Sequence, residues 1–119
     1  MAERVGWITH KGRRILRVDY SGLDGEEFLP VIREVVVAYK GQLPASVYCL
    51  IDVRKAVGTQ VAVDALKDLV KTTREYDKKV AVLGISGLKK AFLALINVFA
   101  KHSMQAFDDE QQALDWLAA

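Results

Sequence analysis

Two uninterrupted apolar runs constrain the fold of this 119-residue chain more than any other feature. They are VYCLI at residues 47–51 and VAVL at residues 80–83. An amphipathic segment of helical spacing separates them. A strand that is apolar at successive positions is covered on both faces, as in a parallel sheet. We therefore expect these two strands to be parallel, adjacent and buried on both faces.

The rest of the chain predicts further strands and helices in alternation. Two β-prone segments, residues 5–10 and 14–20, flank a Lys-Gly-Arg turn and predict an antiparallel hairpin. A last short strand is predicted at residues 104–107. Helical spacing marks four segments, residues 24–41, 63–76, 88–101 and 108–117. The predicted fold class is α/β, in the order β-β-α-β-α-β-α-β-α. Its mixed sheet opens with the hairpin and ends in three parallel strands, because βαβ crossovers are right-handed.

Local signals predict where the first and last of these helices begin. Asp24, with Glu27 three residues later, fits a capping box. Pro30 lies too deep for an undistorted first turn, so we expect either a kink there or a helix that begins near it. Asp108 and Gln111 repeat the capping pattern before the last helix.

Composition and charge exclude several classes of protein. Seventeen basic and fifteen acidic residues give a net charge of +2, which is too balanced to favour nucleic acid as a partner. The single cysteine, Cys49, lies within the first apolar run and is interpreted as a buried core thiol. The first eleven residues carry no targeting pattern, and the longest apolar run has about half of the ~20 residues that a transmembrane helix needs. We expect one cytoplasmic domain over residues 1–119, with no transmembrane segment.

Histidine and cysteine positions predict no catalytic or metal-binding site. His10 and His102 are the only histidines, and no HxxxH or CxxC spacing occurs. Both histidines are interpreted as lacking catalytic partners, with His102 placed at a helix C-terminus where a cation is favoured. We therefore predict no metal, no cofactor and no enzymatic activity.

Polar residues follow both apolar strands, at the edge where ligands bind in open α/β sheets. A Ser-Gly pair after the second strand precedes a helix that starts with two lysines, and a helix N-terminus with cations attracts anions. The alternative is that these residues only cap helices and loops. The candidate anion or ligand residues are Asp52, Arg54, Ser86, Gly87, Lys89 and Lys90.

The helix predicted at residues 88–101 is apolar on nearly all sides. One stripe of it suffices to cover the sheet. The remainder could be covered by neighbouring helices, by a second copy of the chain or by an apolar ligand in a pocket. We predict a homodimer in solution that uses this helix. The candidate interface or pocket residues are Phe92, Leu93, Leu95, Ile96, Val98 and Phe99.

Three stretches of the chain resemble a known family. They are VYCLIDVR at residues 47–54, KKVAVLG at 78–84 and FDDEQQALDWL at 107–117. They resemble the STAS superfamily, the anti-sigma-factor antagonist fold, and more closely its SpoIIAA-like branch of small bacterial proteins. The resemblance implies a STAS-like domain with helices packed on a mixed sheet. It implies no particular biochemical activity, since the SpoIIAA-like branch has none that is agreed.

The resemblance also draws attention to Thr59. In anti-sigma-factor antagonists, a serine of a DSSGL motif at the start of the second helix is phosphorylated. The comparable stretch here is VGTQV at residues 57–61, which keeps a hydroxyl but lacks the acidic residue and the Ser-Gly pair. We predict that Thr59 acts mainly as a helix cap, with its hydroxyl accepting from a backbone N–H two or three residues on. The alternative that the resemblance implies is that Thr59 is a phosphoacceptor.

Together these observations predict a non-catalytic regulatory domain that binds a protein partner. The alternative is a small-molecule carrier or sensor that binds an apolar or anionic ligand beside the helix at residues 88–101.

Overall fold

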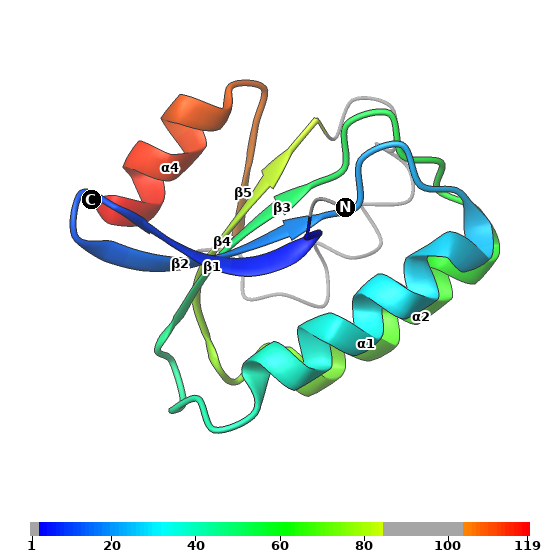
Figure 1. Ribbon diagram of the computed structural model, residues 1–119, viewed down its shortest axis with the longest axis horizontal. Coiled ribbons are helices and arrows are strands. Elements are labelled where there is room, and N and C mark those ends of the chain that lie inside the picture. Colours follow the sequence, from blue (N-terminus) through cyan, green and yellow to red (C-terminus); the bar gives the residue numbers. More distant parts are fainter. Residues whose placement is uncertain (1–2, 85–103) are drawn as a thin grey trace.

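The computed structural model describes residues 3–84 and 104–119, which form one sheet with helices on both faces (Figure 1). The strands are β1 (Val5–His10), β2 (Arg13–Asp19), β3 (Val47–Asp52), β4 (Asp77–Leu83) and β5 (Met104–Phe107). The helices are the short 3-10 helix η1 (Gly25–Glu27), α1 (Phe28–Tyr39), α2 (Gln60–Thr73) and α4 (Glu110–Ala118). The helix predicted at residues 88–101 lies outside the described residues.

The sheet has the order β1-β2-β3-β4-β5. β1 and β2 pair antiparallel, as the hairpin prediction requires, and every other neighbouring pair is parallel. β3 and β4 are adjacent, with Leu50 opposite Ala81, and both of these side chains are fully buried. The predicted fold class is therefore confirmed. β2 joins the three predicted parallel strands as a fourth, because η1 and α1 carry the chain back across the sheet before β3 begins.

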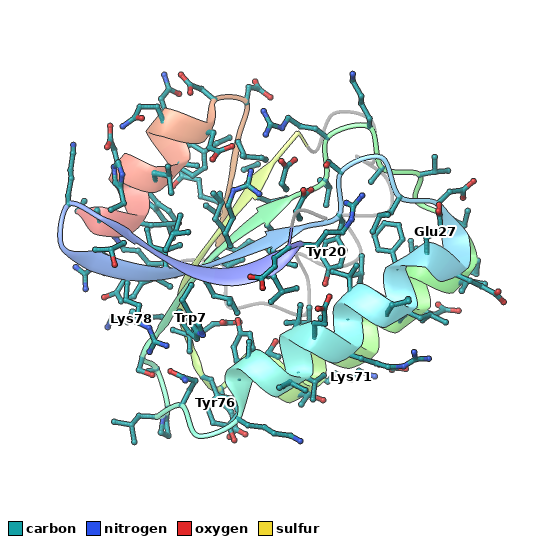
Figure 2. All side chains as sticks on the ribbon, in the orientation of Figure 1. Trp7, Tyr20, Glu27, Lys71, Tyr76 and Lys78 are labelled. Atoms are coloured by element: carbon teal, nitrogen blue, oxygen red, sulfur yellow. The ribbon has the colours of Figure 1, made fainter. Side chains whose placement is uncertain are left out.

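Alternate residues of the strands build two apolar layers. Leu16 and Val18 of β2 face α1 and α2, whereas Ile15 of the same strand faces α4. Figure 1 shows α1 and α2 side by side on one face of the sheet and, among the described helices, α4 on the other. Tyr20, labelled in Figure 2, stacks on Phe28 at a centroid distance of 5.1 Å and closes the layer under α1. Each face of the sheet is thus covered by helix, as its continuous apolar strands demand.

The helix starts confirm one local prediction and correct another. The Glu27 carboxylate accepts a hydrogen bond from the Asp24 backbone N–H at 3.0 Å, and α1 begins at Phe28, near Pro30 as expected. The prediction that Asp108 caps the last helix is wrong by one residue. Asp109 is the cap, and its carboxylate accepts from the Gln111 N–H at 2.8 Å. Either aspartate satisfies the sequence pattern, but the cap is Asp109, whose extended backbone lets its side chain reach that N–H.

A partly buried carboxyl group, Asp77, lies where β4 begins, under the α1 and α2 layer. The Tyr39 hydroxyl donates to it at 2.5 Å, and both residues line a cavity of about 30 Å³ together with Cys49. Burial raises the pKa of Asp77 to about 7, although the hydrogen bond from Tyr39 acts to lower it. Cys49 is buried as predicted, and burial raises the pKa of its thiol. The thiol is therefore protonated and unreactive at neutral pH.

Asp77 makes stability depend on pH in a defined window. Its pKa is about 7 in the folded chain and 3.8 for an unperturbed carboxyl group, so folding takes up a proton between these values. The free energy of unfolding should therefore fall as pH rises from about 4 to about 7, by at most about 1.4 kcal/mol per pH unit. Asp77→Asn should lack this component. Urea unfolding at pH 5 and pH 7.5 measures the difference, with the exposed Asp68→Asn as control. The same pH dependence in wild type and Asp77→Asn would contradict this assignment.

Candidate functional site

Four charged side chains form a compact network at the carboxyl ends of β2 and β3. Asp52, whose side chain is 3% exposed, accepts from Arg54 Nη2 at 2.7 Å and Nε at 3.0 Å, and from Arg17 Nη2 at 3.3 Å. Glu110, the first residue of α4, accepts from Arg17 at 3.0 Å and from Arg54 at 3.2 Å. We call these four residues the Asp52 network. It joins the end of the sheet to the start of α4.

The charges of the Asp52 network compensate one another. Burial acts to raise the pKa of Asp52, but the hydrogen bonds from Arg54 and the charge of Arg17 hold that pKa below its ordinary value. The hydrogen bond to Glu110 raises the pKa of Arg17, and the hydrogen bond to Asp52 raises that of Arg54. Asp52, Arg17 and Arg54 are therefore charged at neutral pH. The structure brings the two predicted residues Asp52 and Arg54 together as partners of each other, and their binding of a ligand stays a prediction.

The loop that carries Arg54 is held against both neighbouring strand ends. The Val53 N–H donates to the Leu83 carbonyl, and the Gly22 N–H donates to the Arg54 carbonyl, each at 3.0 Å. Gly84 packs directly on Arg54, since a Cβ atom at Gly84 would lie 2.4 Å from Arg54 Cγ. Gly84 also has a φ of +76°, a conformation that favours glycine. The position of the Arg54 loop is thus fixed by backbone contacts as well as by charge.

Sequence reasoning missed Arg17 and Glu110 as members of this network. One signal for Arg17 was present, because the alternation of β2 places it on the same face as the buried Ile15. An arginine on a buried face needs a carboxylate partner. Glu110 carried no such signal, because its contact with Arg17 spans 93 residues of sequence.

Thr59 lies at the N-terminus of α2, as the resemblance implied. Its hydroxyl accepts from the Ala62 N–H at 3.4 Å, which confirms the predicted helix cap. The two valines on either side of it in the chain are exposed, Val57 by 49% and Val61 by 47%. Val57 is held in place by its N–H, which donates to the Leu23 carbonyl at 2.8 Å. We call Val57, Thr59 and Val61 the Thr59 surface.

The other predicted site residues lie outside the described part of the chain. They are the candidate ligand residues Ser86, Gly87, Lys89 and Lys90 and the candidate interface residues Phe92, Leu93, Leu95, Ile96, Val98 and Phe99. His102 lies there too. Their predicted roles stay predictions.

The interpretation that both histidines lack partners is wrong for His10. Its Nε2 lies 2.8 Å from Asp115 Oδ1, and Lys11 Nζ lies 3.0 Å from the same oxygen. Hydrogen bonds from His10 and Lys11 lower the pKa of Asp115 to about 2. The sequence could not show this contact, because it joins the β1–β2 hairpin to α4 across 105 residues. The prediction of no enzymatic activity remains a prediction.

The described residues lack two features that would suggest other kinds of site. Residues 3–84 and 104–119 contain no group of three or more His, Cys, Asp or Glu side chains arranged to hold a metal ion. Among the helices of the same residues, none combines the length and the hydropathy that spanning a membrane requires.

Comparison with solved structures identifies the fold. The chain is similar to an uncharacterized protein of the DUF3478 family from Shewanella loihica PV-4, whose crystal structure has a SpoIIAA-like fold. The TM-score is 0.73 at 22% sequence identity, and the match covers 95% of this chain and 91% of that one. No family model matches the chain, and no curated protein matches it. This chain thus has a SpoIIAA-like fold, as its sequence predicted.

Removing the charge of Asp52 should destabilise the domain. In Asp52→Asn, Arg17 and Arg54 keep only Glu110 as a carboxylate partner, and one of the two buried oxygens that accept from them is replaced by an amide N–H donor. Because both arginines are partly solvated, we expect the free energy of unfolding to fall by roughly 2–3 kcal/mol, below the range for fully buried pairs. Urea unfolding measures the change, and the exposed Asp68→Asn is the matched control. A loss no larger than that of the control would mean that the network does not stabilise the fold.

Proposed function

We propose that this protein is a non-catalytic, cytoplasmic regulatory domain that docks a protein partner through the Thr59 surface. The observation that carries the proposal is the exposure of two valines, 49% and 47%, on either side of a helix-capping hydroxyl. Single exposed apolar residues are common on protein surfaces. Two of them around the position that the SpoIIAA resemblance marks for phosphorylation favour an apolar contact with a partner.

The backbone around the Thr59 surface is suited to docking because it is already ordered. Asp24 and Val57 form an isolated parallel β-bridge, and Val57 donates to Leu23. The helix cap fixes Thr59, and the Asp52 network anchors the start of the same loop at Arg54. A surface that is rigid before binding loses little conformational entropy when a partner docks.

Thr59 would allow the contact to be regulated. A phosphate on its hydroxyl would sit at the N-terminus of α2, where free N–H groups and the helix dipole favour negative charge. The same phosphate would place about two negative charges between two apolar side chains. Phosphorylation of Thr59 would thus be tolerated by the fold and would oppose an apolar interface.

A role as a small-molecule carrier is the second candidate. The cavity beside Tyr39, Cys49 and Asp77 has a volume of about 30 Å³, which is enough for water but not for an organic ligand. This cavity is therefore too small to store an organic ligand. In this second candidate function, the ligand would bind beside residues 88–101.

Docking can be tested by placing a charge on the Thr59 surface. In Val57→Asp and Val61→Asp, an interface would have to bury an unpaired carboxylate, which costs several kcal/mol. Val37→Asp is the matched control, because Val37 is 62% exposed on α1, away from Thr59. We expect at least one protein from the native cells to be retained by immobilised wild type and Val37→Asp, and retained about tenfold less by both test variants. Quantitative mass spectrometry of the retained proteins measures this.

Two outcomes would contradict the docking proposal. One is that no protein is retained specifically by the wild type. The other is that Val37→Asp loses the retained proteins as fully as Val57→Asp and Val61→Asp do. Circular dichroism of all three variants confirms that they are folded before the comparison is made.

We also propose that the chain forms a homodimer through the apolar segment at residues 91–100. The support is the sequence of that segment, which has more apolar side chains than one sheet contact needs. Light scattering after size exclusion should give about twice the chain mass of 13.2 kDa. Leu93→Asp and Val98→Asp should shift the protein toward monomer, whereas Val37→Asp should not. A wild type that is monomeric at high micromolar concentration would rule the dimer out.

A further inference from the structure

The first strand, β1, forms one side of the described sheet and is paired there on one side only. Among the described strands, β1 pairs with β2 alone, in unbroken register along its six residues. Its sequence, VGWITH, contains no proline, lysine, arginine or carboxylate. Proteins commonly protect an exposed edge strand with a proline, a charge or a bulge, because a free edge pairs readily with another strand. The described part of the chain provides none of these protections along β1.

The backbone groups on the free side of β1 belong to alternate residues. The Asp19 N–H donates to the Arg4 carbonyl at 2.7 Å, so this opposite pair, next to the first pair of the β1–β2 register, is hydrogen-bonded. Opposite residues of an antiparallel ladder alternate between hydrogen-bonded and non-hydrogen-bonded pairs. The even-numbered residues of β1 therefore bond to β2. The N–H and C=O groups of Val5, Trp7 and Thr9 point away from β2 and toward the free side.

An apolar groove of about 350 Å³ lies between β1 and α1. The fully buried Leu16 lies at its base, Trp7 lines it from β1, and Val37 and Ala38 line it from α1. Figure 2 shows the Trp7 side chain on the side of the sheet that faces α1. Trp7 thus presents its free backbone groups and its groove-lining side chain together. A strand that paired with β1 would therefore place every second side chain over the groove.

The charges beside the groove are more positive than negative. Arg14 Cζ lies 3.8 Å from the centre of the Trp7 ring, and Arg33 lines the groove from α1. Neither arginine forms an ion pair with any residue in 3–84 or 104–119. Glu34 is the single carboxylate among the described residues that line the groove. An acidic segment is therefore favoured here over a basic one.

We propose that β1 binds an extended acidic segment of a partner protein as an additional antiparallel strand. The main chain of the segment pairs with the outward groups of Trp7 and Thr9, as in other complexes where a peptide extends a sheet. An antiparallel arrangement is chosen because it is slightly more stable per residue than a parallel one. An aliphatic side chain opposite Trp7 enters the groove, and acidic side chains on either side of it face Arg14 and Arg33.

This groove is separate from the Thr59 surface, with which it shares no residue. In the retention experiment on the Thr59 surface, a protein bound at the groove would be lost from Val37→Asp and retained by Val57→Asp and Val61→Asp. A protein bound at the Thr59 surface would show the opposite pattern. The two docking proposals can therefore fail separately.

Titration with a capped synthetic peptide, acetyl-TETITET-amide, tests the proposal on the full chain by NMR at low ionic strength. In an extended peptide of this sequence, the isoleucine and the two glutamates lie on one face. We expect one peptide to bind per chain and to shift the backbone amide signals of Val5, Trp7 and Thr9. The comparison peptide, acetyl-TKTITKT-amide, should bind about tenfold more weakly, because its lysines are repelled by Arg14 and Arg33.

Substitutions at Thr9 test whether the backbone of β1 makes the contact. Thr9→Pro removes an outward N–H but no bond to β2, and proline is tolerated at such positions of edge strands. Thr9→Ala is the matched control, because it removes the same side chain and keeps the N–H. We expect Thr9→Ala to bind the acidic peptide as the wild type does, and Thr9→Pro to bind it about tenfold more weakly.

Methylated peptides give a second measurement that holds even if Thr9→Pro fails to fold. In the antiparallel arrangement, the amides of the isoleucine and the glutamates face β1, and those of the threonines face away. Methylation of the first set should abolish binding, and methylation of the second set should leave it. The proposal is overturned if the wild type binds no peptide, if Thr9→Pro and Thr9→Ala bind equally, or if the acidic and basic peptides bind equally.

Discussion

The central strands β3 and β4 must be covered on both faces, and the rest of the structure follows from that constraint. Their side chains are apolar on both sides, with Leu50 and Ala81 facing α4 and Cys49 and Val80 facing α1 and α2. Burying such a pair requires helices on both faces and connections that cross the sheet. The crossing connections make the strands parallel. Parallel strands all begin at one edge of the sheet and all end at the opposite edge. The loops at these two edges therefore come from different parts of the sequence and differ in chemistry.

The carboxyl edge and the amino edge of this sheet differ in how their charges are arranged. At the carboxyl edge, Arg17 and Arg54 are paired with Asp52 and Glu110, and the valines Val57 and Val61 are exposed. At the amino edge, Arg13 stacks on Tyr48 on the α4 face and Arg14 stacks on Trp7 on the α1 and α2 face, with no carboxylate partner for either among the described residues. The charges of the Asp52 network are therefore paired with one another, whereas the two arginines at the amino edge are divided between the two faces of the sheet.

Sequence patterns correctly predicted the structural features that depend on residues close together in the chain. The apolar runs at residues 47–51 and 80–83 predicted β3 and β4. Thr59 was predicted as a helix cap, and the N–H that donates to its hydroxyl belongs to Ala62, only three residues along the chain. The patterns failed where an interaction depends on how distant segments meet. His10 meets Asp115, and Arg17 meets Glu110, only because α4 packs over the first two strands. The pattern also could not decide which of two adjacent aspartates, Asp108 or Asp109, caps the last helix, because both have a glutamine three residues later.

The contact between Gly84 and Arg54 limits which substitutions this sequence can accept during evolution. Any side chain at position 84 would strike not only the flexible stem of Arg54 but also its Cα, 3.0 Å away, and would meet an unfavourable backbone angle. Shortening residue 54 therefore would not make room at position 84. Related chains that keep this loop should retain glycine at position 84 while position 54 drifts, and a lineage that loses the glycine should have rebuilt the whole turn.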